Sequence, residues 1–127
     1  MKRHVGIAIA LVTGAAMGAA GVSALHAQAK LKAYSVTEQE VIDASAVPAY
    51  TGPVQAALKA AGGHILDTGG KVVGVAGAAP PKRVIINQWD SVEQAEAFYK
   101  SKAFTDLAPQ RDKAVKVNRI YIVETIK

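Results

Sequence analysis

The chain has 127 residues, a formal net charge of +5 and no cysteine. This length allows at most one domain once a leader segment is set aside. The lack of cysteine excludes a disulfide scaffold, a thiol nucleophile, a thiolate metal site, an iron–sulfur cluster and a lipid-modified bacterial lipoprotein.

Residues 1–29 have the three-part pattern of a cleavable signal peptide. A basic start over residues 1–4 precedes an uncharged stretch over residues 5–22, and small residues then surround Ala27-Gln28-Ala29. This small-x-small pattern predicts cleavage after Ala29, which leaves residues 30–127 as the mature domain. Cleavage after Ala27 is an alternative, although it places Leu25 where a small residue is preferred.

A retained membrane anchor is the competing interpretation of this leader, because 18 uncharged residues approach the length that spans a bilayer. The stretch is rich in Ala and Gly and has few strongly apolar side chains, which favours removal over anchoring. We therefore predict a periplasmic or secreted bacterial protein that has no membrane contact after signal cleavage.

The mature domain is nearly balanced in charge. Without Lys2 and Arg3 it has 13 basic and 10 acidic residues, a net charge of +3. An excess of this size is typical of a solvated surface. We expect no nucleic-acid partner.

Residues 33–41 predict a first strand, because apolar and polar side chains alternate along them. Asp43 is a candidate N-cap for a helix over residues 44–61. Pro48 and Gly52-Pro53 predict a kink in that helix or its division into two abutting pieces. Gly62-Gly63 should end it, with Gly62 in the left-handed conformation.

The middle of the chain predicts two or three further strands. Residues 64–68 form a short one, and Gly69-Gly70 could turn it into residues 71–75, with a loop over residues 77–81. Residues 83–89 carry the strongest strand signal, since Val, Ile and Ile run together as in a strand buried on both faces.

The last third predicts a helix up to Lys100, with Ser91 and Gln94 forming a capping box at its start. A shorter helical piece over residues 103–108 should end at Pro109. Residues 117–123 then form the closing strand.

This order, β-α-β-β-α-β, predicts an α+β domain with the ferredoxin-like antiparallel sheet. The helices of such a domain cover one face of the sheet. The other face would carry Tyr, Trp, Val and Ile side chains, and an apolar face of that size needs a partner subunit or a ligand as a cover. The sequence therefore predicts a homodimer with a cleft between the sheet and its cover.

A set of short motifs in fixed order carries a family resemblance. They are Asp43, Tyr50, Gly62-Gly63, Pro80-Pro81-Lys82-Arg83-Val84, Trp89-Asp90-Ser91, Ala95, Phe98-Tyr99, Ser101 and Arg111. Over residues 34–124 the chain resembles the family known as domain of unknown function 1330. The resemblance implies a dimeric α+β barrel, in which two ferredoxin-like subunits pack sheet to sheet. Relatives in that wider group include cofactor-free monooxygenases, isomerases and haem enzymes, but the resemblance implies no particular activity.

The chain departs from the family pattern at three places. It has Ala76-Gly77 where a Glu-Gly pair is usual, Phe104 where Tyr is common and His64 where Arg is frequent. The missing Glu removes the carboxylate best suited to general acid–base chemistry, which weakens an enzymatic interpretation.

Two residues are candidates for catalysis. His64 is the only histidine of the mature chain, and histidine is the residue type best suited to proton transfer near neutral pH, so it could carry a proton; an ordinary surface position is the simpler interpretation. Arg111 could grip a ligand carboxylate with two hydrogen bonds, or it could pair with Asp90, Asp106 or a helix end.

Five other residues are candidates for ligand binding. Three aromatic side chains, those of Trp89, Tyr99 and Tyr34, could line an apolar pocket, or they could anchor the core and an interface. Asn87 and Ser101 are possible hydrogen-bonding groups beside such a pocket.

No motif of the mature chain indicates a cofactor. It has no phosphate-binding loop, no dinucleotide fingerprint, no nucleophile elbow and no cluster with metal-ligand spacing, so we expect neither cofactor nor metal. The sequence thus predicts an exported homodimer that binds or transforms a small molecule. The alternative is a non-catalytic structural or binding module whose cleft is filled by its own side chains.

Overall fold

The computed structural model describes residues 31–126, so the predicted signal peptide, its cleavage site and the anchor alternative lie outside the described residues. The elements are, in chain order, β1 (Ala33–Val41), the 3-10 turn η1 (Ala44–Ala46), α2 (Val47–Ala60), β2 (His64–Thr68), β3 (Arg83–Trp89), α3 (Val92–Lys100), α4 (Lys102–Thr105), α5 (Ala108–Ala114) and β4 (Val115–Glu124). Within residues 31–126, no helix has the length and apolar character needed to cross a membrane.

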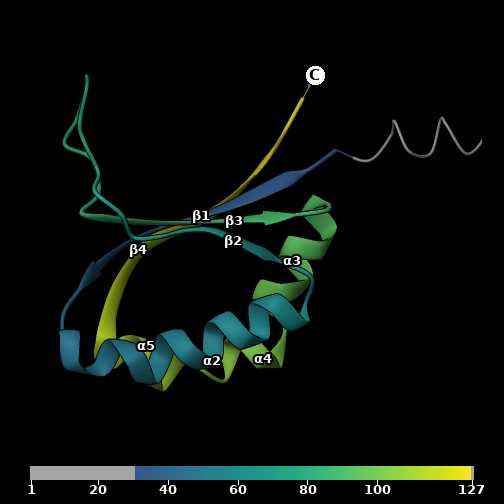
Figure 1. Ribbon diagram of the computed structural model, residues 1–127, viewed down its shortest axis with the longest axis horizontal. Helices are drawn as coiled ribbons and strands as arrows, with labels where there is room; N and C mark the ends of the chain where they lie inside the picture. Colours follow the sequence, from purple (N-terminus) through teal and green to yellow (C-terminus); the bar gives the residue numbers. More distant parts are fainter. Residues whose placement is uncertain (1–30, 127) are drawn as a thin grey trace, which may run out of the picture. The chain divides into compact units, whose positions relative to one another are not determined.

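The four strands form one antiparallel sheet in the order β2-β3-β1-β4. Figure 1 shows all the helices on one side of this sheet, with the loop of residues 69–82 projecting from one end of it. We call the side that the helices cover the helix face and the opposite side the outer face. The predicted ferredoxin-like α+β fold is confirmed.

The first three strands have the predicted bounds, but the extra strand expected at residues 71–75 is wrong. Among the described strands β2 pairs with β3 alone, and β3 begins at Arg83, so residues 71–75 pair with no strand of residues 31–126. The side chains of Val84, Ile85 and Ile86 are half-buried instead of fully buried. Val84 and Ile86 lie on the outer face, which has no cover among the described residues, and Ile85 lines the cavity described below.

The helical segment after β1 does consist of two abutting pieces, η1 and α2, and they meet between Ala46 and Val47, just before Pro48. Only the predicted break at Gly52-Pro53 is wrong, because α2 runs through Pro53. A shared apolar face explains this continuity, since Tyr50, Val54 and Leu58 follow at intervals of four and pack against the core.

Pro109 begins α5 instead of ending the preceding helix. A proline in the first turn of a helix lacks only an N–H group that would have no partner within the helix, so it favours a start over an end.

The start of α3 differs in detail from a capping box. Ser91 Oγ accepts a hydrogen bond from Gln94 N at 3.1 Å, as expected. Gln94 Oε1, however, accepts from Asp90 N at 2.8 Å, and Gln94 Nε2 donates to Ala61 O at 3.1 Å. The Gln94 side chain therefore ties the start of α3 to the end of α2, where Gly62 has the predicted positive φ of 91°.

The core lies between α3 and the sheet and is centred on Trp89, which is 0% exposed. The centroid of its indole ring lies 5.2 Å from that of the Phe98 ring, and the centroids of the Phe98 and Phe104 rings are 5.3 Å apart. Ser35 Oγ, also fully buried, accepts hydrogen bonds from Trp89 Nε1 at 2.9 Å and from the Tyr99 hydroxyl at 2.8 Å. This cluster forms a rigid wall beside the cavity described next.

Candidate functional site

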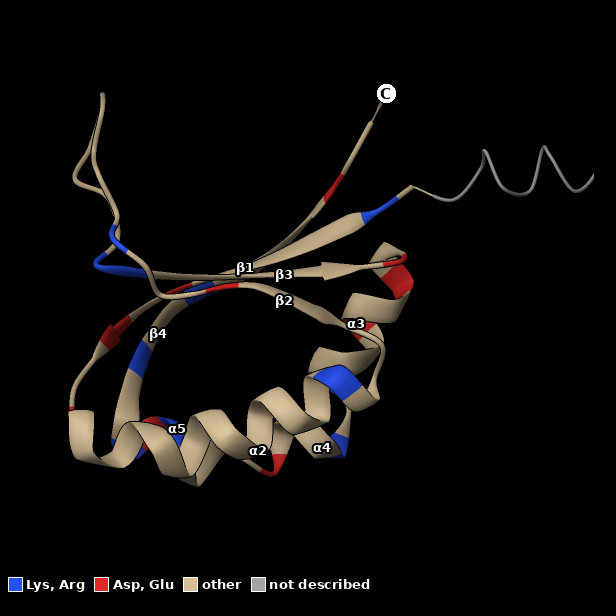
Figure 2. Cartoon of the chain, in the orientation of Figure 1, with Lys and Arg blue, Asp and Glu red and all other residues tan. Residues whose placement is uncertain are grey.

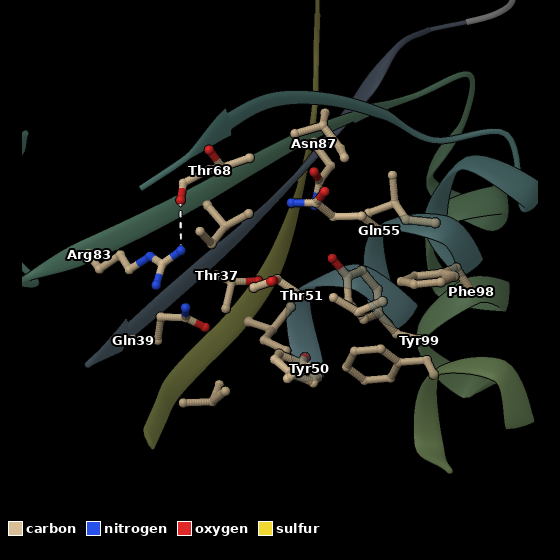
Figure 3. Close-up of a pocket in the computed structure, with 17 residues that line it drawn as sticks. Thr37, Gln39, Tyr50, Thr51, Gln55, Thr68, Arg83, Asn87, Phe98 and Tyr99 are labelled. Carbon is tan, nitrogen blue, oxygen red and sulfur yellow. Dashed lines mark hydrogen bonds between the residues drawn. The ribbon is translucent and has the colours of Figure 1, made fainter. Parts of the chain in front are cut away.

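A cavity lies between α2 and the helix face of the sheet, and Figure 3 shows its walls. The space between the walls is about 620 Å³, a figure that includes the part open to solvent. The enclosed part is smaller, so the cavity suits only a small ligand. Seventeen residues line it, of which the polar ones are Thr37, Gln39, Tyr50, Thr51, Gln55, Thr68, Arg83, Asn87 and Tyr99.

Two neighbouring strands supply the floor of the cavity. Alternate residues of a strand face the same side, so Arg83, Ile85 and Asn87 of β3 all reach the helix face. The register places Thr37 beside Ile85 and Gln39 beside Arg83 on β1. The floor therefore presents a guanidinium group, an apolar patch and an amide in sequence along β3.

Asn87 carries a polar atom that the protein itself does not satisfy. The residue is 4% exposed, and its Oδ1 atom is buried without a hydrogen-bond partner. Buried polar groups are almost always paired, because leaving one unpaired costs about 1–3 kcal/mol. Asn87 is also one of the residues that line the cavity.

Arg83 lies at the opposite end of β3 from Asn87, on the more exposed side of the cavity. Its Nη2 atom donates to the carbonyl oxygen of Thr68 at 2.8 Å, the contact drawn as a dashed line in Figure 3. In that view Arg83 and the rings of Phe98 and Tyr99 occupy opposite ends of the cavity. One end is therefore cationic and open, and the other is aromatic and buried.

Two tyrosines, Tyr50 and Tyr99, line the cavity. Burial raises the pKa of Tyr50 above its usual value, against the opposing effect of the nearby Arg111 charge. The Tyr99 hydroxyl is held by its hydrogen bond to Ser35. Neither side chain is arranged to act as a base.

The structure brings Asn87 and Tyr99, two of the predicted ligand-binding residues, to the cavity, and does not bring the other three. Trp89 is sealed in the core behind it. Tyr34 lies on the outer face, since its neighbours Ala33 and Ser35 face the helices. Ser101 caps α4, accepting a hydrogen bond from Phe104 N.

The two predicted catalytic residues lie apart from the cavity lining as well. His64 is exposed on edge strand β2, paired with Gln88 on the outer face. Arg111 lies on α5, and its Nε atom forms an ion pair with Asp112 at 3.1 Å. Their catalytic roles remain predictions that the geometry does not support.

Sequence reasoning missed Arg83, Thr37 and Gln39. Their signal is an alternation on two strands that pair: Ser35, Thr37 and Gln39 on β1 face Asn87, Ile85 and Arg83 on β3. Polar residues at every second position of a central strand indicate a hydrated or ligand-binding helix face. This signal becomes readable only once the register of the two strands is known.

The outer face combines apolar side chains with one ion pair. Arg119 donates to both carboxylate oxygens of Glu38, at 2.6 and 3.0 Å, and Tyr121 donates to the same carboxylate at 3.2 Å. The hydrogen bond from Arg119 holds the pKa of Glu38 below its usual value. Around this pair the apolar side chains of Tyr34, Val36, Ile86, Tyr121 and Val123 share the outer face.

No group of histidine, cysteine or acidic side chains suited to a metal ion occurs within residues 31–126.

The sequence matches the model of one protein family, domain of unknown function (DUF1330), over residues 32–126. The chain belongs to this family. No protein of curated function matches it.

Among solved structures, the chain of this DUF1330 protein is similar to RPA0582, a protein of unknown function from Rhodopseudomonas palustris. The TM-score is 0.61 at 16% identity, with 84% of this chain and 93% of the other covered. The methylated RPA0582 protein gives a TM-score of 0.58 at 15% identity, covering 84% and 91%. At these identities the likeness supports the fold alone.

Proposed function

We propose that this domain binds a small organic molecule in the cavity between α2 and the sheet. The observation that carries the proposal is that Asn87, one of the residues lining the cavity, has a buried Oδ1 atom without a hydrogen-bond partner. An apolar pocket with a few convergent polar groups is the usual form of a small-molecule site. The open space also argues against the alternative of a cleft filled by its own side chains.

The lining supports binding better than acid–base catalysis. None of the seventeen residues drawn in Figure 3 is an aspartate, glutamate or histidine. Proton transfer at neutral pH usually needs such a group within hydrogen-bond reach of the substrate. We therefore assign the cavity the task of holding and orienting a ligand.

Thr51→Phe is expected to abolish binding by filling the cavity. Thr51 lines the cavity from α2 and is half-buried, so a phenyl ring there would occupy the space of the ligand. With tyrosol as the probe, calorimetric titration should show affinity at least about tenfold weaker than for the unsubstituted protein, since the lost contacts are worth about 1.4 kcal/mol or more.

The matched control is Ala56→Phe, which places the same ring on an exposed position of the same helix. This variant should bind tyrosol as the unsubstituted protein does. Equal affinity in both variants would mean that the probe binds elsewhere, and would overturn the assignment of the cavity.

We also propose that two copies of the domain pack through their outer faces. Tyr121 and Val123 are 40% and 47% exposed there, beside Tyr34 and Val36, and no element within residues 31–126 covers them. Sedimentation at micromolar concentration should give the mass of a dimer. Val123→Lys should give a monomer, and Ala56→Lys on α2 should not; a monomeric mass for the unsubstituted protein would contradict the proposal.

Export is the remaining part of the proposed role, supported by the signal-peptide pattern of residues 1–29. Mass spectrometry of the protein recovered from the periplasm or medium of a bacterial host should find a chain that begins at Lys30. A full-length chain that remains with the cells would speak against export.

A further inference from the structure

We propose that the ligand of this cavity is a small organic acid, whose carboxylate binds Arg83 at the open end and whose far end carries a hydroxyl group that donates to Asn87. This inference rests on the proposed binding function and adds the chemical class of the ligand. Three features of the described residues support it: the state of Arg83, the order of groups along β3 and the charges around the open end.

Most N–H groups of the Arg83 guanidinium have no hydrogen-bond partner among the described residues. A guanidinium group carries five N–H donors, and the bond to Thr68 O is the one hydrogen bond of its side chain among the described residues. None of the ion pairs found within residues 31–126 involves Arg83. A planar carboxylate matches the remaining donors in a bidentate geometry.

The backbone beside Arg83 keeps its side chain in place. Gly69 has a φ of 108°, and a side chain there would overlap Arg83 Nε and approach its Cγ at 2.9 Å. The N–H groups of Gly69 and Gly70 both donate to Asp67 Oδ1 at 3.0 Å, which holds this turn. Arg83 is therefore packed over a fixed turn and does not need to be ordered by the ligand.

The order of side chains along β3 indicates the order of chemical groups expected along the ligand. Arg83 and Asn87 face the cavity four residues apart, so their Cα atoms are separated by roughly 13 Å. Ile85 lies between them on the same face, and Val54, Leu58 and Phe98 line the same cavity. An anion, an apolar or aromatic body and a terminal hydroxyl, in that order, complement this surface.

The charges around the open end favour an anion over a cation. Lys82 and Lys71 belong to the loop that joins β2 to β3, and Figure 2 shows blue at both ends of this loop. Two carboxylates lie nearby, Glu40 at 3.9 Å from Lys82 and Asp67 at the turn beside Arg83, so Lys71, Lys82 and Arg83 exceed them by one positive charge. The positive potential that remains would attract a carboxylate and discourage an amine.

Two probes differ only in the group that Arg83 would bind. Para-hydroxyphenylacetate carries a carboxylate, and tyrosol has a neutral CH₂OH in its place. The experiment titrates both into the unsubstituted protein, Arg83→Gln and Lys82→Gln by calorimetry. Lys82→Gln is the matched control, because it removes the same charge from an exposed neighbouring position outside the cavity.

We expect the carboxylate probe to bind at least about tenfold more tightly than tyrosol to the unsubstituted protein. Arg83→Gln should remove this preference, while Lys82→Gln should change it less than about twofold. Tyrosol should bind all three proteins alike, which also shows that Arg83→Gln is folded.

Three results would overturn the inference in recognisably different ways. Equal binding of both probes to all three proteins would be consistent with a ligand site in the cavity, but it would contradict the proposed contact between Arg83 and a ligand carboxylate. Equal losses in both variants would replace a specific contact by a general electrostatic effect. If neither probe binds the unsubstituted protein, the proposed function fails together with the ligand class.

Discussion

Trp89→Ala is expected to lower the free energy of unfolding by about 3–5 kcal/mol, the usual cost of truncating a buried tryptophan. The side chain is 0% exposed, contacts Phe98 at 5.2 Å between ring centroids and donates to Ser35. A domain of this size has a total stability of only about 5–15 kcal/mol. The variant should therefore be close to unfolding at physiological temperature.

Thermal unfolding measures this effect, and the midpoint should fall by more than about 12 °C. Trp89→Phe is the control, because it keeps an aromatic ring in the cluster and loses only the indole N–H and part of the volume. Its loss should be clearly smaller than that of Trp89→Ala. A shift of less than about 4 °C for Trp89→Ala would mean that Trp89 is not the centre of the core.

Ser35→Ala is expected to lower the free energy of unfolding by about 1–3 kcal/mol, although it removes a single oxygen atom. Ser35 Oγ is the acceptor for both Trp89 Nε1 and the Tyr99 hydroxyl, at 2.9 and 2.8 Å. The indole N–H is fully buried, so it would lose its partner without gaining water. The cost therefore comes from the donors left behind, not from the hydroxyl removed.

A double-mutant cycle with Tyr99→Phe separates the two donors. Because Tyr99→Phe already removes one of them, Ser35→Ala should cost less in that background than alone. Urea denaturation of the four proteins gives the coupling energy directly. Purely additive losses, or a loss below about 0.5 kcal/mol for Ser35→Ala, would contradict the role of Ser35 as a shared acceptor.

Most of the fold could be predicted from local signals. The alternation over residues 33–41, the apolar run of β3 and the Ser91 cap identify three elements, and the order of strands and helices identifies the topology. The errors fall where local residues are ambiguous. Pro109 can end a helix or begin one, and only the packing of α5 against its neighbours decides between them.

Less of the candidate site could be predicted, because it depends on which strands pair and in what register. Asn87 and Tyr99 could be predicted as candidate site residues, because they are a polar and an aromatic residue near the ends of elements that the sequence identifies. Arg83 reads as an ordinary first residue of a strand, and only its pairing with Gln39 and its place above the Gly69 turn show that it faces the cavity. His64, the most reactive residue by type, lies on the other face of the sheet.

The central claim is that the cavity binds a ligand that pairs with Asn87. The side-chain amide resonances of Asn87 test it most directly, in proton–nitrogen NMR spectra recorded as para-hydroxyphenylacetate is added. We predict saturable shifts of these resonances, larger than the shifts of residues on the outer face such as Val123. Unchanged Asn87 amide resonances while the probe binds, with shifts confined to the outer face, would contradict the account.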